Sequence, residues 1–228
     1  KLARYNGKVV YFDTHAGRGK HSAGTEGSPL VAISTLLEHS ACDTILSRCQ
    51  VNFMFWELDP DNAAALRTEV EALKLTDPRL QDPRKIVIQL IEGDSFEQLS
   101  ALLGRMRDAG VRLAPSFFFI DPFGFKVPGA LLREIMNFDK AELFLNVMWR
   151  ELHMTICNAK KSPGGADDAI LRTLFLRDDW HRVLTETERA PCAQQAIALL
   201  GDTAASEWTT HVEMLDDQHT IRYLLVHL

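Results

Sequence analysis

Five short apolar runs, separated by longer amphipathic segments, constrain the fold of this chain more than any other feature of its sequence. The runs are rich in β-branched and aromatic residues, as strands are, and their almost continuous apolarity suits strands that are covered on both faces. We expect these strands at Val9–Asp13, Val51–Leu58, Lys85–Gly93, Ser116–Asp121 and Ala141–Trp149. The intervening helices are expected at Pro29–Glu38, Pro60–Leu73, Ser95–Ala109 and Pro128–Phe138. This alternation predicts an α/β fold with a mostly parallel sheet.

The pattern changes after Trp149, where the sequence becomes polar and helical. We expect a helical insertion at about Glu151–Glu207, followed by an antiparallel hairpin with strands at Thr210–Leu215 and Thr220–Leu228. A chain of 228 residues can bury one substantial core, so we expect a single domain. Because the last strand is apolar up to Leu228, we expect the full-length protein to continue beyond that residue.

Composition narrows the possible functions. A hydrophobic share of 46% beside 25% charged residues is ordinary for a soluble globular protein, and there is neither a membrane-spanning run nor a secretion signal. We therefore expect a cytoplasmic protein with no membrane partner. The net charge of -6 gives no overall sign of nucleic-acid binding, although a local basic groove is compatible with it. The four cysteines are too scattered for a zinc site, so we expect no metal and reduced, buried thiols.

Acidic residues stand at the ends of four successive strands. These residues are Asp13, Glu57, Asp94 and Asp121. Each alone has an ordinary explanation, because carboxylates cap helices and turns commonly carry Asp and Gly. Ligands of open parallel sheets, however, bind outside the carboxyl ends of the strands, where all four would lie. Together they predict a binding site at that edge.

The glycine turn at Ala16–Lys20 follows the first strand and could serve three kinds of cofactor. A phosphate loop would need glycine at Thr14 and a small hydroxyl residue at His21, so that interpretation fails at two positions. A dinucleotide fingerprint would need a third glycine at Ser22, and its ribose-binding acid would be Glu38, inside an expected helix. A nicotinamide-dependent oxidoreductase is therefore the weaker alternative.

S-adenosylmethionine suits the strand ends better. Its binding needs a glycine turn at the methionine portion, a carboxylate after the second strand for the ribose hydroxyls, a polar residue after the third strand beside the adenine, and a fourth strand end facing the methyl group. The first need is met by Gly17 and Gly19. Glu57, Asp94 and Asp121 meet the others in order. We therefore favour S-adenosylmethionine as the cofactor.

Five sequence motifs carry a resemblance to a known family. They are DTHAGRG, GSPL at Gly27–Leu30, FWELD, GDSF and FFFIDPFGF. The series resembles the three-Cys-motif partner proteins, a bacterial group of class I S-adenosylmethionine-dependent methyltransferase-like proteins, and the resemblance extends from about Tyr11 to Leu228. It implies a Rossmann-like three-layer sandwich and a possible protein partner, a radical-enzyme-like protein with three cysteines.

The resemblance also implies roles for individual residues. The cofactor-binding residues would be Asp13, Ala16, Gly17, Gly19, Glu57, Leu58, Asp94, Ser95 and Asp121. The catalytic segment would be Asp121-Pro122-Phe123, which stands where amino-methyltransferases carry D-P-P-Y. Here the aromatic residue comes one position early, and Gly124 follows it.

An exocyclic amine of an RNA or DNA base is the acceptor that this segment favours. Asp121 could hold its N–H groups, and Phe123 or Phe125 could stack on a flipped base, although a core position is equally open for both rings. Lys126 could contact a phosphate. The same holds for Lys20, His21, Arg150, Lys160 and Lys161. Direct methyl displacement requires no nucleophilic side chain. A cofactor-binding or partner-binding module without transferase activity is the other alternative.

Overall fold

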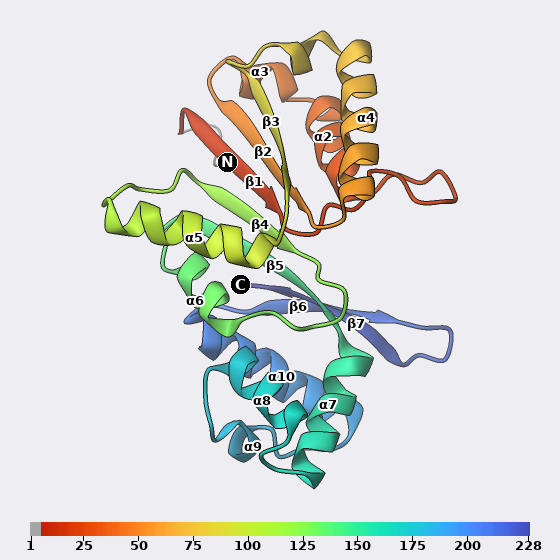
Figure 1. Ribbon diagram of the computed structural model, residues 1–228, viewed down its shortest axis with the longest axis vertical. Helices are drawn as coiled ribbons and strands as arrows, with labels where there is room; N and C mark the ends of the chain where they lie inside the picture. The colour runs from red at the N-terminus through yellow and green to blue at the C-terminus, as the bar shows by residue number, and fades with distance from the viewer. Residues whose placement is uncertain (1–5) are drawn as a thin grey trace. The chain divides into compact units, whose positions relative to one another are not determined.

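The computed structural model describes residues 6–228 and contains two compact units, one up to Phe119 and one from Ile120 to Leu228 (Figure 1). The first unit alternates strands and helices along the chain. Its strands are β1 (Lys8–Asp13), β2 (Gln50–Glu57), β3 (Ile86–Glu92) and all but the last residue of β4 (Ser116–Ile120). Its helices are α2 (Ser28–Glu38), α3 (Cys42–Leu46), α4 (Pro60–Thr76), the 3-10 helix η1 (Pro78–Gln81) and α5 (Ser95–Asp108).

The strands of the first unit are parallel. β1 lies between β2 and β4, and β3 flanks β2. The register places Asp13 opposite Phe55 and Glu57 opposite Glu92, so the acidic strand ends come to one edge. The edge of the sheet predicted to bind a ligand is therefore assembled as expected for β1, β2 and β3.

Two apolar layers, one on each face of the strands, hold the first unit together. On one face, Phe53 and Phe55 pack with α2 and α4 in a cluster that includes Ile33 and Leu66. On the other face, Phe12 stacks on Phe118 with ring centroids 4.3 Å apart and on Trp56 at 6.0 Å. Trp56 is therefore core, as strand alternation predicts for a neighbour of Glu57.

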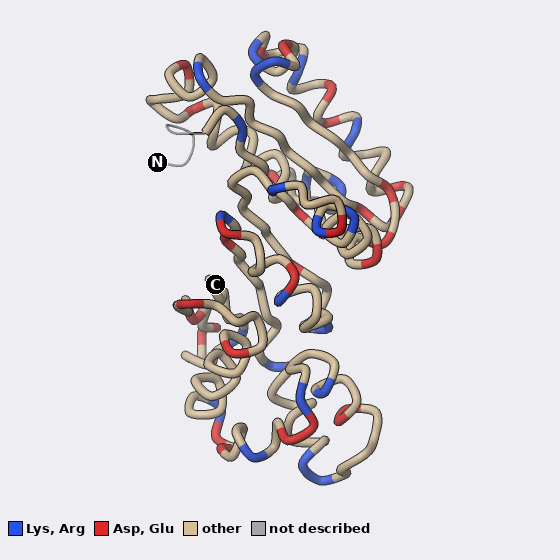
Figure 2. Tube along the Cα trace, turned by 90° about the vertical axis from the view of Figure 1, so that its left-hand side faces the viewer, with Lys and Arg blue, Asp and Glu red and all other residues tan. Residues whose placement is uncertain are grey.

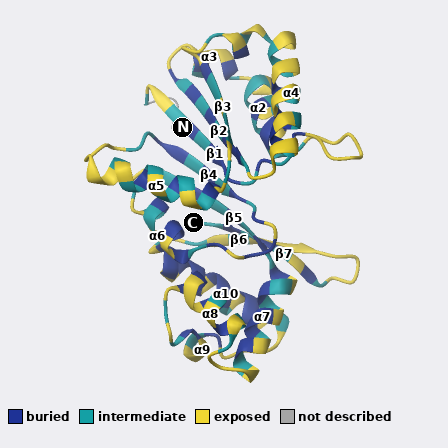
Figure 3. Cartoon of the chain, in the orientation of Figure 1, coloured by how far each residue is buried: buried dark blue, intermediate teal, exposed yellow. Residues whose placement is uncertain are grey.

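The second unit combines three strands with one helix that precedes them and with the helices of the expected insertion. Its strands are β5 (Ala141–Met148), β6 (Thr210–Leu215) and β7 (Ile221–His227). Its helices are α6 (Gly129–Met136), α7 (Trp149–Lys161), α8 (Ala166–Phe175), α9 (Trp180–Val183) and α10 (Arg189–Ala204). β7 pairs antiparallel with both β5 and β6, and helices α6, α7 and α10 contact these strands. Buried residues alternate with less buried ones along β5 and β7, while β6 is exposed along most of its length (Figure 3).

Within residues 6–228, seven strands follow the order β3-β2-β1-β4-β5-β7-β6. The prediction of an α/β fold with a mostly parallel sheet and a C-terminal antiparallel hairpin is thus confirmed. The described part of the chain contains no helix with the length and apolar character needed to cross a membrane.

Candidate cofactor-binding site

The glycine turn after β1 depends on two residues with positive φ. Gly17 has φ +65° and Gly19 has φ +85°. Residues that carry a Cβ rarely adopt this left-handed backbone conformation. A Cβ on Gly19 would also lie 3.2 Å from Leu66 Cδ1 of α4. The turn is fixed to β2 as well, because Ala16 N donates to Trp56 O at 2.8 Å. It is therefore a packed turn and not a loose connection.

An exposed loop, residues 20–26, connects this turn to α2. Its ends are held together by an antiparallel backbone β-bridge between Lys20 and Glu26. In addition, Gly27 N donates a hydrogen bond to Gly19 O at 2.6 Å. Lys20 Nζ lies 2.6 Å from Glu69 Oε2. That ion pair gives Lys20 a structural partner and argues against a phosphate-binding role for it.

Glu57 organises the turn from the end of β2. Its Oε2 accepts a hydrogen bond from Gly17 N at 2.7 Å, and its Oε1 accepts one from Asp59 N at 2.9 Å. The structure thus joins Glu57 and Gly17, which the sequence places 40 positions apart. A carboxylate has about four lone-pair sites, so two remain for further donors such as ribose hydroxyls. Leu58, the next residue, is exposed.

Asp13 is completely buried and connects the turn to α2. Its Oδ1 accepts from His15 N at 3.1 Å, and its Oδ2 accepts from Ser28 Oγ at 2.6 Å. Sequence reasoning did not assign a role to Ser28, although it lies in the GSPL motif. Asp13 therefore anchors both ends of the segment that carries the glycines, and its contact with a cofactor stays a prediction.

The end of β3 is linked to the same region through the backbone. Gly93 N donates to Glu57 O at 3.0 Å. Asp94 caps α5, because its Oδ1 accepts from Glu97 N at 3.0 Å, and Ser95 is buried. One Asp94 oxygen is thus used for capping, and the predicted role of Asp94 and Ser95 beside adenine is not tested by these contacts.

The contacts of His15 could not be predicted from the sequence. Its Nδ1 lies 2.8 Å from the hydroxyl of buried Thr14, and its ring packs edge-on against Phe96 of α5 at 5.1 Å. These contacts connect the loop after β1 with the start of α5. No periodic pattern could have revealed them, because they depend on how the two strand ends come together.

The Asp121-Pro122-Phe123 segment lies in the second unit, where β5 holds it at two points. Asn146 Nδ2 donates to Asp121 Oδ1 at 2.8 Å, and Met148 N donates to Gly124 O at 3.1 Å. Asn146 was missed from the sequence. A single amide in the apolar strand FLNVMW is a usable signal, because a buried polar group needs a partner.

The aromatic residues of this segment differ in exposure. Phe123 is 96% exposed, whereas Phe125 is 3% exposed and belongs to the core of its unit. Pro122 is buried and Lys126 is exposed. Phe123 therefore presents its ring to solvent, while the burial of Phe125 disfavours its predicted stacking role.

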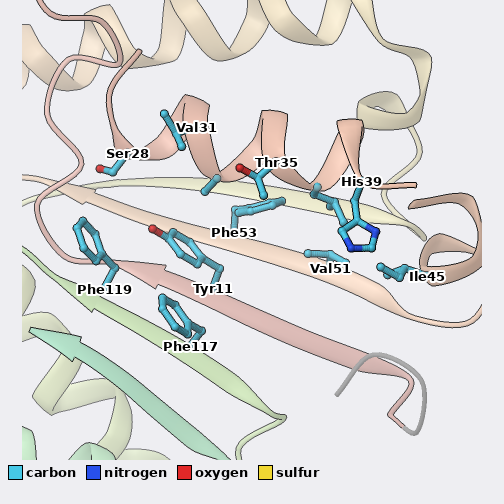
Figure 4. A pocket seen from close by; sticks show the side chains of 12 residues that line it. Tyr11, Ser28, Val31, Thr35, His39, Ile45, Val51, Phe53, Phe117 and Phe119 are labelled. Carbon is cyan, nitrogen blue, oxygen red and sulfur yellow. The ribbon is translucent and has the colours of Figure 1, made fainter. Parts of the chain in front are cut away.

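A cavity of about 560 Å³ lies beside α2 in the first unit (Figure 4). Its lining residues are Tyr11, Ser28, Val31, Ala32, Thr35, Leu36, His39, Ile45, Val51, Phe53, Phe117 and Phe119. Figure 4 shows the rings of Tyr11, Phe117 and Phe119 standing on the strands opposite α2. The volume is typical of small-molecule sites, and Ser28 connects this cavity to the Asp13 anchor.

The strand order, the antiparallel seventh strand, the glycine turn after β1 and the acidic end of β2 together define the class I methyltransferase fold. Among residues 6–228, His, Cys, Asp and Glu side chains form no group of three or more that could hold a metal ion.

Comparisons with known proteins give structural matches at low sequence identity. No protein family and no curated protein matches the sequence. Among solved structures, a precorrin-6y C5,15-methyltransferase from Geobacter metallireducens is 8% identical with a TM-score of 0.39, over 99% of this chain and 81% of that one. A Podospora anserina methyltransferase with bound S-adenosylhomocysteine is 9% identical with a TM-score of 0.39, over 98% and 72%. Fibrillarin from Aeropyrum pernix with bound S-adenosylmethionine is 10% identical with a TM-score of 0.35, over 100% and 68%.

These similarities are low, and the fold assignment rests on the chain's own strand order. The resemblance to three-Cys-motif partner proteins is not supported by a family match and stays a prediction.

Proposed function

We propose that this protein is an S-adenosylmethionine-dependent methyltransferase acting on an amino group of a nucleic-acid base. The observation that carries the cofactor assignment is the Glu57 carboxylate, which holds Gly17 N and Asp59 N and has acceptor capacity left. That arrangement fits a cofactor with a ribose diol and a methionine tail. When bound, S-adenosylmethionine supplies an electrophilic methyl group.

The residues of the first unit would bind and orient this cofactor. Gly17 and Gly19 lack side chains, so backbone can approach the methionine portion closely. Glu57 would accept hydrogen bonds from the ribose hydroxyls, and Asp94 with Ser95 would lie beside the adenine. Because the turn is already hydrogen-bonded to Glu57, little of it has to rearrange on binding.

Asp121 would hold the acceptor amine. The hydrogen bond from Asn146 engages Asp121 Oδ1, and within the described residues Oδ2 is available to accept an N–H. Phe123, which is 96% exposed, offers an aromatic face on which a base could stack. A base in a duplex would first have to be flipped, at a cost of a few kcal/mol. Catalysis then consists of positioning and electrostatics, without a protein nucleophile.

A nicotinamide-dependent oxidoreductase fits less well. Its fingerprint places the opening of a helix directly after the glycines, so that the pyrophosphate meets the helix N-terminus. Here an exposed loop follows Gly19, and α2 begins only at Ser28. A module that binds the cofactor without transferring a methyl group is distinguished from an enzyme by activity alone.

Two measurements test the proposal. Calorimetry with S-adenosylhomocysteine and with NAD should show binding of the former only; binding of NAD alone would overturn the cofactor assignment.

The second measurement offers labelled S-adenosylmethionine to RNA, DNA, peptide and metabolite pools. We expect label in RNA or DNA, its loss in Asp121→Ala, and no change in Asp139→Ala, an exposed aspartate of the same unit. Label in peptide only would refute the acceptor class, and no label in any pool would favour the inactive module.

A further inference from the structure

The helical insertion of the second unit contains a cavity of about 430 Å³, which we call the insertion cavity. Its lining residues are Ala159, Lys160, Pro163, Asp168, Arg172, Trp180, His181 and Thr185. They come from α7, α8 and α9 and from the segments that follow α7 and α9. The volume is in the range of small-molecule sites, and no lining residue belongs to the proposed methyl-transfer machinery.

The buried carboxylate of Asp168 forms part of the wall of this cavity. Asp168 is 4% exposed; its Oδ1 accepts from Trp180 Nε1 at 2.7 Å, and its Oδ2 accepts from Gly164 N at 2.9 Å and Arg172 Nε at 3.1 Å. The hydrogen bond from Trp180, together with those from Arg172 and Gly164, lowers the pKa of Asp168. Arg172 is also paired with Asp178 at 2.8 Å. Arg172 therefore forms ion pairs with both Asp168 and Asp178, so its charge is already neutralised within the protein.

Lys160 differs from Arg172, because its partners are neutral. Its Nζ donates to Thr185 O at 3.2 Å and to Glu186 O at 2.8 Å. In the described part of the chain, no carboxylate forms an ion pair with this ammonium group. An ammonium group has three N–H donors, so one is left after the two carbonyl bonds. Lys160 is thus a positioned cation that lines a cavity and lacks a counter-ion.

Two further donors line the same cavity. Thr185 Oγ1 accepts from Gln195 Nε2 at 3.0 Å, which leaves the hydroxyl proton available for donation. The His181 ring is held at 90° to Trp180 with centroids 5.9 Å apart. Ala159 and Pro163 supply apolar surface. The cavity therefore combines a cation and two polar donors with an apolar wall.

We propose that the insertion cavity binds a phosphate group, with Lys160 as its counter-ion and Thr185 and His181 as hydrogen-bond donors. A phosphate ester has several acceptor oxygens and so can use all three donors at once. If the phosphate belongs to a polynucleotide substrate, this inference rests on the proposed function and adds a substrate contact to it. If the phosphate belongs to a free nucleotide, the inference does not depend on the proposed function. Lys and Arg are interspersed with Asp and Glu along the second unit (Figure 2), so the recognition would be local.

The test uses two adjacent lysines at the end of α7. Lys160 lines the cavity, whereas Lys161 is exposed at the surface, so Lys160→Gln and Lys161→Gln remove the same charge from neighbouring positions. Titration calorimetry would use inorganic phosphate, a nucleoside 5′-monophosphate and a short single-stranded RNA. Because a charge-assisted hydrogen bond is lost, we expect Lys160→Gln to weaken phosphate binding about tenfold or more and Lys161→Gln to change it less than about twofold.

The three probes distinguish a polynucleotide phosphate from the phosphate of a free ligand. Binding of RNA alone assigns the site to a polynucleotide, and binding of phosphate and the mononucleotide alone assigns it to a free ligand. Absence of binding to all three probes, or equal losses in both variants, overturns the proposal. His181→Ala gives an independent check should Lys160→Gln unfold. Since no probe contains S-adenosylmethionine, failure of phosphate binding is distinguishable from failure to bind S-adenosylhomocysteine.

Discussion

Replacing Glu57 by Gln tests the central contact of the candidate site. The carboxylate accepts from two backbone N–H groups, Gly17 N at 2.7 Å and Asp59 N at 2.9 Å. In Glu57→Gln one oxygen becomes an NH2 group, which faces one of these N–H groups donor to donor. Loss of one charge-assisted hydrogen bond costs about 1.5–3 kcal/mol. In a chain of this length, that loss lowers the melting temperature by about 3–12 °C.

Urea denaturation and calorimetry with S-adenosylhomocysteine would measure the effect. Glu92→Gln is the matched control, because Glu92 is exposed and lies opposite Glu57 in register on β3. We expect the control to change the free energy of unfolding by less than about 0.5 kcal/mol. We expect Glu57→Gln to weaken cofactor binding about tenfold or more. Equal unfolding midpoints for the two variants would refute the assignment of Glu57 as the organiser of the turn.

Three other substitutions or modifications test separate parts of the structure. Gly19→Ala should lower the melting temperature more than Gly24→Ala in thermal denaturation, because both have positive φ but only Gly19 would bring its Cβ against α4; equal losses would contradict the close packing. Asp168→Asn should destabilise the protein above about pH 4 and progressively less at lower pH. The reason is that the folded-state pKa of Asp168 is depressed, so the contribution of its carboxylate to the free energy of unfolding is lost as pH falls through that value. A difference in urea titrations that does not vary with pH would argue against this role. Thiol titration at pH 8 should modify Cys157 first, because the other three cysteines are buried and burial raises their pKa; rapid reaction of all four would be the contrary result.

Much of the fold could be predicted because long apolar runs leave little choice of structure. β1, β2, β3, β4 and β5 begin and end within one or two residues of the expected bounds, and the hairpin of β6 and β7 lies where predicted. Hydrophobic periodicity does not reveal α3 (Cys42–Leu46) or η1 (Pro78–Gln81), because so few residues do not complete a periodic pattern. Within the insertion, the individual helices depend on tertiary packing, so only the helical character was predictable.

The candidate site was predictable to the level of strand ends. Acidic residues at carboxyl ends identify Asp13 and Glu57 without a structure, since parallel strands bring those ends together. The partners that hold them were not predictable. Ser28 bonds Asp13 and Asn146 bonds Asp121 only because folding places their side chains within reach.

The exposed loop between the glycine turn and α2 has a practical consequence. Its two ends are held by the backbone β-bridge between Lys20 and Glu26 and by the hydrogen bond from Gly27 N to Gly19 O. Among residues 6–228, no atom outside the immediate chain neighbours lies within 4 Å of where a Cβ on Gly24 would be. Loop tips of this kind tolerate insertion. A short peptide carrying a fluorophore, inserted at Gly24, would therefore lie a few residues from the glycine turn without distorting it. The emission of this fluorophore would report ligand binding in real time.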